Sequence, residues 1–145
     1  MSYDDSVMLL WSLTSQSLAT GTTISAAGNS GPYNGLTPNN STTVDLRHSD
    51  DYWLSATAAG GAGSNLKVQL NLFDDQGNIF QFISSATPLL GVTVASAPGQ
   101  AIAFAGRHGG GSTGSNYLVP SPWGQVAWTI GSGSMTGVNI ALYGR

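Results

Sequence analysis

The chain has 145 residues, which is the size of one domain, and a formal net charge of −3. It has no cysteine, and this excludes disulfides and thiolate metal sites. Only 8% of the residues are charged, with no glutamate and a single lysine, Lys67, so the composition disfavours surface helices and favours strands and turns. The scattered basic residues provide no face for nucleic acid, and no apolar run approaches the roughly 20 residues of a membrane-spanning helix.

The N-terminus, Met1–Asp5, carries acid where a secretory signal peptide carries base. The apolar run Val7–Trp11 that follows is short and soon interrupted. We therefore expect the protein to be made and folded in the cytosol, without secretion by that route. Residues 1–16 are a possible arm that reaches a neighbouring subunit.

Alternation of apolar and polar residues predicts half-buried strands. In Thr43–Arg47, Val44 and Leu46 point to one side of the strand. In Leu66–Leu72 every second residue is apolar, the turn formers Asp74–Asn78 follow, and Ile79–Ile83 is extended again, which predicts a β-hairpin.

The C-terminal part of the chain repeats this pattern. Gln125–Ile130 places Val126, Trp128 and Ile130 on one face, and Val138–Leu142 alternates in the same way. Because Gly131–Ser134 separates the two segments with turn-forming residues, the pattern predicts a second hairpin.

Shorter segments give weaker strand signals. They are Val7–Leu13, Thr22–Ala26, Tyr52–Ala56, Gly91–Ala95 and Ala101–Ala105. Together the segments amount to eight or nine short strands with almost no helix. The sequence therefore predicts an all-β chain, an antiparallel jelly-roll-like β-sandwich that forms one domain over residues 1–145.

Two long irregular segments interrupt the strands. Asn29–Asn40 is rich in turn formers, and Gly106–Pro122 is rich in glycine and proline. Loops of this length are uncommon unless they are functional or disordered. We expect the glycine-rich segment to order against a neighbouring subunit in an assembly.

The residues give no catalytic centre. Ser112 within Gly110–Gly114 has the spacing of a nucleophile elbow, but no helix signal follows it. Gly106–Thr113 resembles a phosphate-binding loop but lacks the lysine that reaches the phosphates. We therefore expect no enzyme activity and no cofactor.

The residues give no metal centre either. His48 and His108 are too far apart in sequence for a ligand pair. The aspartate pairs at 4–5, 50–51 and 74–75 could hold calcium in loops, but turn chemistry explains the pair at 74–75 and strand ends explain the others. We therefore expect no bound metal.

Aromatic residues supply the candidate contact sites. Trp11 and Trp128 lie within apolar alternation and are expected in the core, whereas Trp123, between Pro122 and Gly124, is expected to be the most exposed indole. Exposed indoles either pack at protein interfaces or stack on sugars. The candidate partner or glycan contacts are Tyr33, Arg107, His108, Tyr117 and Trp123.

Over residues 1–85 the chain resembles capsid decoration, or cement, proteins, which are small virion structural proteins of tailed bacteriophages with a jelly-roll-like sandwich. The elements that carry the resemblance are the unprocessed N-terminus, Thr20–Thr23, the strand Val44–Leu46, and the strand Leu66–Leu72 entering the turn Asp74–Asn78. None of these elements carries a functional residue over to this chain.

The resemblance implies a homotrimer or other small ring in the virion that binds the major capsid protein and reinforces the capsid lattice. A low-charge surface fits this role, because a neighbour covers it with little desolvation cost. The alternatives are a tail-tip or fibre-head module, or a lectin-like module, that binds carbohydrate; an enzyme ranks last.

Overall fold

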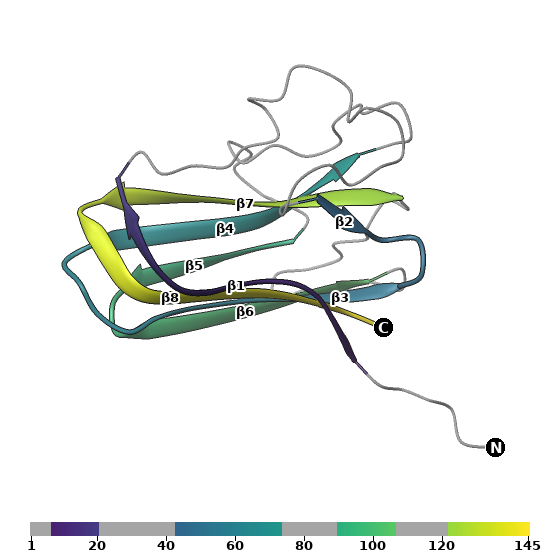
Figure 1. The fold of residues 1–145 in the computed structure, drawn as a ribbon, viewed down its shortest axis with the longest axis horizontal. Coiled ribbons are helices and arrows are strands. Elements are labelled where there is room, and N and C mark those ends of the chain that lie inside the picture. The colour runs from purple at the N-terminus through teal and green to yellow at the C-terminus, as the bar shows by residue number, and fades with distance from the viewer. Residues whose placement is uncertain (1–6, 21–42, 74–89, 107–121) are drawn as a thin grey trace.

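The computed structural model describes residues 7–20, 43–73, 90–106 and 122–145, which form strands connected by turns (Figure 1). The strands are β1 (Met8–Ala19), β2 (Thr43–Asp45), β3 (Asp51–Ala58), β4 (Ser64–Phe73), β5 (Gly91–Ser96), β6 (Gly99–Gly106), β7 (Trp123–Ser132) and β8 (Ser134–Gly144). These ranges contain no helix, and hence none long and apolar enough to cross a membrane.

The strands form two four-stranded antiparallel sheets. Sheet A has the order β1-β8-β3-β6, and sheet B has the order β2-β7-β4-β5. The first four strands thus pair with the last four in reverse sequence order: β1 with β8, β2 with β7, β3 with β6 and β4 with β5. A two-stranded ribbon wound in this way into two sheets is a jelly roll, so the predicted fold class is confirmed.

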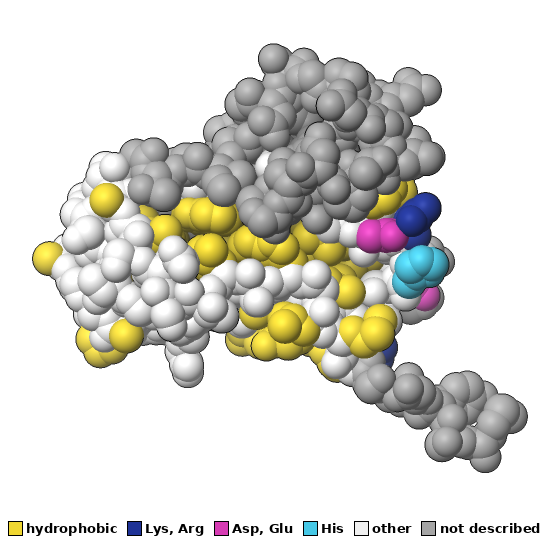
Figure 2. All heavy atoms as spheres, viewed as in Figure 1, with side chains coloured by type: hydrophobic (Ala, Val, Ile, Leu, Met, Phe, Trp, Pro, Cys, Tyr) yellow, Lys and Arg dark blue, Asp and Glu magenta, His cyan; other side chains and the backbone are white. Residues whose placement is uncertain are grey.

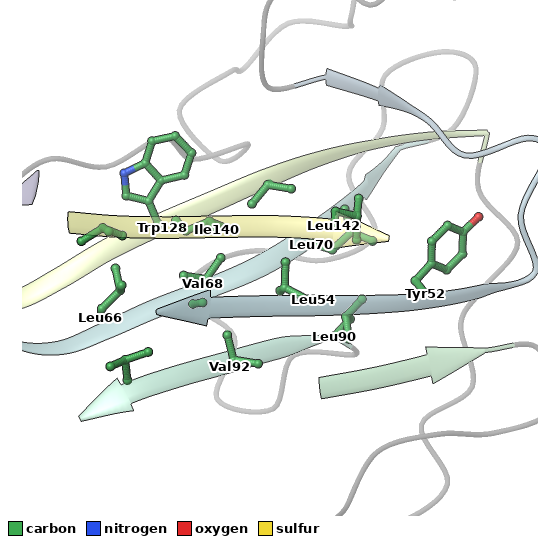
Figure 3. Packing of buried hydrophobic residues seen from close by; sticks show 14 of the residues in the cluster. Tyr52, Leu54, Leu66, Val68, Leu70, Leu90, Val92, Trp128, Ile140 and Leu142 are labelled. Atoms are coloured by element: carbon green, nitrogen blue, oxygen red, sulfur yellow. The ribbon is translucent and has the colours of Figure 1, made fainter. Parts of the chain in front are cut away.

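The core fills the space between the sheets, because each strand turns alternate side chains inward. Leu66 and Leu70 of β4 in sheet B, and Leu54 and Leu142 in sheet A, are fully buried. Figure 3 shows these side chains converging from both sheets. The alternation seen in the sequence therefore identified the apolar residues that hold the sheets together.

Most of the predicted strands are present in the described ranges. Every strand candidate within those ranges corresponds to a strand. The other predictions fall outside the described residues: the strand Thr22–Ala26, the irregular segment Asn29–Asn40, the turn Asp74–Asn78, the extended segment Ile79–Ile83, and residues 107–121 of the glycine-rich segment. The described sheet partners of β4 are β5 and β7.

The predicted C-terminal hairpin is wrong. β7 lies in sheet B and β8 lies in sheet A, so the two strands are consecutive but not paired. Gly133 alone separates them, with a φ of 65°, and a Cβ there would lie 2.9 Å from the carbonyl oxygen of Ala62. The glycine lets the chain turn from one sheet to the other, which places the apolar faces of β7 and β8 opposite each other across the core.

Of the possible N-terminal arm at residues 1–16, the structure describes residues 7–16. Residues 8–16 belong to β1, which pairs with β8 from Met8↔Gly144 to Ala19↔Ser134. The pairing has register shifts after Leu9, after Leu13 and after Gln16. These irregularities break the alternation of inward and outward side chains, and this explains why the strand signal of this segment is weak.

Candidate interaction surface

Charge is concentrated at one end of the sandwich, which we call the charged end. In the described ranges it holds Asp45, Arg47, Asp50, Asp51 and Arg145, and Figure 2 shows the charged side chains of the visible face gathered there. Lys67, near the middle of β4, is exposed and stands apart from them. The opposite end consists of the neutral turns 59–63, 97–98 and 133.

The first ion pair of the charged end lies just after β2. Arg47 donates from Nε and Nη2 to the two carboxylate oxygens of Asp45, at 2.9 and 2.7 Å. This hydrogen-bonded guanidinium lowers the pKa of Asp45 from 3.8 to about 2. Arg47 also lies over the ring of Trp123, 4.8 Å from its centroid, so the pair packs against the start of β7.

The second ion pair fastens the last residue to β3. Arg145 Nη2 lies 3.1 Å from Asp51 Oδ2, and the backbone amide of Arg145 donates to the carbonyl oxygen of Asp51 at 3.0 Å. The carbonyl of Arg145 in turn accepts from the amides of Asp50 and Asp51. The Arg145 guanidinium lies 5.4 Å from the ring centroid of Trp53, which faces outward on the same strand.

A buried tyrosine holds the turn between the two ion pairs. Tyr52 is 5% exposed, and its hydroxyl lies 2.8 Å from the carbonyl oxygens of both Leu46 and Ser49. The ring belongs to the core, while the hydroxyl donates to the turn. The charged end therefore has a fixed backbone, and its side chains are positioned by the core beneath them.

The outer face of sheet A carries a row of apolar side chains from one edge to the other. Leu9 of β1 is opposite Tyr143 of β8, Tyr143 is opposite Trp53 of β3, and Trp53 is opposite Phe104 of β6. We call these four residues the apolar row. Because residues directly opposite each other in an antiparallel pair point to the same face, the row is continuous across the sheet.

Two members of the row contact each other, and all four remain accessible. The rings of Trp53 and Phe104 have centroids 5.1 Å apart at an interplanar angle of 42°, a tilted aromatic pair. The three aromatic residues are partly exposed, and Leu9 is 56% exposed. Ile102, two residues before Phe104 on β6, is 70% exposed and extends the apolar surface along that edge.

The outer face of sheet B is different, because three of its polar residues are buried. Gln69 and Asn71 of β4 and Gln125 of β7 point out of the sandwich, yet they are at most 4% exposed. Gln69 Nε2 donates to Asn71 Oδ1 at 2.7 Å. This part of sheet B therefore does not offer its side chains as a surface.

The expected exposure of Trp123 is wrong. Trp123 is the first residue of β7, a central strand, opposite Asp45 of β2 on one side and Phe73 of β4 on the other. It is 3% exposed and lies beneath the Arg47 guanidinium. A side chain in this position presents no ring face to a sugar.

The other indoles are divided between core and surface. Trp128 is buried, as predicted. Trp11 is half-buried and stacks on Trp128 with centroids 5.9 Å apart, so it packs at the margin of the core. Trp53 is not among the candidate contacts predicted from the sequence, although the inward alternation of Tyr52, Leu54 and Ala56 places it on the outer face.

No family model, curated protein or solved structure matches the chain.

The remaining candidate contacts and the chemical motifs lie outside the described residues. These are Tyr33, Arg107, His108 and Tyr117, together with Ser112 and the aspartate pairs at 4–5 and 74–75. His48 is exposed in the turn after β2. In the described ranges, no three histidine or carboxylate side chains come together as a group that could hold a metal ion.

Proposed function

We propose that this chain is a non-enzymatic structural protein of a bacteriophage virion, a capsid decoration protein. In this role it self-associates as a trimer and binds the major capsid protein on the outside of the capsid. It stabilises the lattice by covering junctions between capsid subunits. The jelly roll supports the proposal, because this architecture is frequent in viral capsid domains, although lectins and cupins also use it.

The observation that carries the proposal is the apolar row on sheet A. Soluble monomers rarely leave a contiguous apolar surface of this kind uncovered, and such patches mark interaction sites. Here the row crosses the sheet from Leu9 to Phe104, and Ile102 is 70% exposed beside it. Sheet A is therefore the face that we assign to protein contacts.

The distribution of charge supports the same role. On the side of the row away from the charged end, the outward-facing neighbours on sheet A are Ser12, Ala141 and Ser55, which are neutral and small; on the other side, Asp51 and Arg145 neutralise each other as an ion pair. Covering such side chains does not require the removal of water from an unpaired ion, which is the large cost of burying lysine or glutamate. The ion pairs lie at the charged end, so a partner can cover the face of the sheet without burying a lone charge.

The test is made on virions of the phage that carries the gene. Deletion of the gene should give particles that lack this chain in mass spectrometry and release their DNA at a lower temperature than wild-type particles. Purified protein added back should sediment with the deleted particles and restore their heat resistance. Wild-type virions that contain none of the chain would refute the proposal.

A second candidate function is carbohydrate binding by a tail-tip or lectin-like module. The three outward-facing aromatic rings of the row favour it, since such rings can stack on sugars. It ranks second because the Trp53 ring already has two neighbours that compete with a sugar for its surface. The Phe104 ring centroid lies 5.1 Å from that of Trp53, and the Arg145 guanidinium lies 5.4 Å from it. Glycan-array binding that is lost in Trp53→Ala and kept in Trp123→Phe would favour this function over capsid decoration.

A further inference from the structure

The four sheet edges differ in how well they are protected against pairing with another strand. An exposed edge strand can pair with another chain, and proteins limit this with short strands, bulges, charges or proline. On sheet B, β2 has three residues and is followed by the Asp45–Arg47 ion pair, and β5 has six residues with Thr93 facing outward. Both edges are short.

The β6 edge of sheet A has none of these protections. Its eight residues pair with β3 without a register shift, from Asp51↔Gly106 to Ala58↔Gly99. The strand contains no charged residue and no proline. Its outward-facing Ile102 is the most exposed large apolar side chain in the described part of the chain. A regular, neutral edge of this length is suited to pairing with a further strand.

The opposite edge of sheet A carries the matching apolar surface. The large apolar side chains classed as exposed in the described ranges are Val7, Met8, Leu9 and Ile102. Val7 immediately precedes β1, Met8 and Leu9 begin it, and Ile102 is on β6, so all four are at the two edges of one sheet. This placement indicates that both edges are covered in the functional protein.

The strand directions allow one edge to pair with the other. Each neighbouring pair in the order β1-β8-β3-β6 is antiparallel, so β1 and β6 also run in opposite directions. A second copy beside the first, with its β1 against β6, would continue the antiparallel alternation of sheet A. Leu9 of the second copy would then lie next to Phe104 of the first, because Leu9 and Phe104 are the two ends of the apolar row that crosses sheet A.

The irregular half of β1 limits where this pairing can occur. The register shifts after Leu13 and after Gln16, and the φ of 52° at Ser15, disturb the second half of the strand. The first half, from Met8 to Leu13, has one shift and carries the exposed apolar residues. Both proposed contact edges are neutral, so no charge would be buried without a partner.

We propose that copies of this chain associate head to tail, the first half of β1 of one copy pairing with β6 of the next. Because the two surfaces in this contact are different, repetition of the contact closes into a ring when the rotation between copies allows it. The trimeric size of the ring rests on the proposed function. The contact itself rests on the two edges of sheet A.

The test uses one lysine substitution on each edge and a control on sheet B. Leu9→Lys should disable the β1 edge, Ile102→Lys should disable the β6 edge, and Thr93→Lys places the same charge on the β5 edge. Size-exclusion chromatography with light scattering measures the mass of each protein at micromolar concentration. Far-ultraviolet circular dichroism checks the fold, and Leu9→Gln and Ile102→Gln replace any lysine variant that does not fold.

We expect three chain masses for the wild type and for Thr93→Lys, and one chain mass for each of the other two variants. An equimolar mixture of Leu9→Lys and Ile102→Lys should form a species of two chain masses, because one intact β1 edge meets one intact β6 edge. A two-fold contact between β6 strands would instead leave Leu9→Lys associated, and that result overturns the proposal. So does a monomeric wild type.

This outcome is separable from that of the proposed function. A ring that disappears with either edge substitution but does not bind capsids would uphold the inference and refute the decoration role. A wild-type monomer that binds capsids and restores their heat resistance would do the reverse.

Discussion

Replacement of Tyr52 by phenylalanine tests how the charged end is attached to the core. The substitution keeps the buried ring and removes one hydroxyl, which lies 2.8 Å from two carbonyl oxygens. The carbonyl of Leu46 still accepts from the amide of Ser49, at 3.4 Å, whereas the carbonyl of Ser49 loses the hydroxyl altogether. The variant therefore loses one net hydrogen bond, and the carbonyl oxygen of Ser49 is left without the hydroxyl donor.

The magnitude follows from these contacts. A net intramolecular hydrogen bond contributes about 1 kcal/mol, and an acceptor left without its partner in a buried site adds to that loss, so we expect the free energy of unfolding to fall by about 1 to 2 kcal/mol. With an unfolding entropy of about 2.1 cal/mol/K per residue, the same change lowers the melting temperature of a chain of this length by about 3 to 7 °C.

Thermal and urea unfolding monitored by circular dichroism measure this loss. The matched control is Tyr143→Phe, because Tyr143 lies on the neighbouring strand β8 with its side chain on the outer face of the sheet. We expect this control to change the unfolding free energy by less than about 0.5 kcal/mol. Equal effects in the two variants would refute the assignment of a hydrogen-bonding role to Tyr52.

Three further predictions concern the core, the turn and pH. Leu54→Ala should lower the unfolding free energy by about 2 to 5 kcal/mol, because the side chain is fully buried between the sheets; a loss below about 1 kcal/mol in urea would contradict this packing. Gly133→Ala should cost at least about 1 kcal/mol, since its φ of 65° disfavours a side chain, whereas Gly131→Ala should cost less; the same unfolding measurement decides. Since the pKa of Asp45 is lowered to about 2, its contribution is present above about pH 4 and lost as the pH falls toward 2. Asp45→Asn should therefore lose less stability over that range than the wild type, by under about 1 kcal/mol because the pair is exposed, and identical pH profiles would exclude this contribution.

The sequence predicted the strands and their inward faces, because those depend on local alternation. Leu66, Val126 and Ile140 were each assigned to an apolar face and are buried. The turn at Gly133 was misread because a glycine-serine segment serves equally well in a hairpin and in a crossing between sheets. The choice between them depends on where the other strands lie.

Burial of polar and aromatic residues could not be predicted in the same way. Trp123 has a proline before it and a glycine after it, which indicates a loop, but it starts a central strand. Asn71 was correctly assigned to the outward side of β4, yet it is 0% exposed. Alternation indicates to which side a residue points and does not indicate what covers that side. Trp53 and Phe104 lie 51 positions apart in the sequence and meet only because β3 pairs with β6, so their contact has no local signal.

The position of β8 has a consequence for biosynthesis. Residues 134–144 are made after all the other described strands, but they lie between β1 and β3 within sheet A. While the ribosome is still adding them, β1 lacks its sheet neighbour, and the core between the sheets lacks Val138, Ile140 and Leu142. The nascent chain therefore exposes apolar surface until β8 emerges, and this is the interval in which a chaperone would engage it.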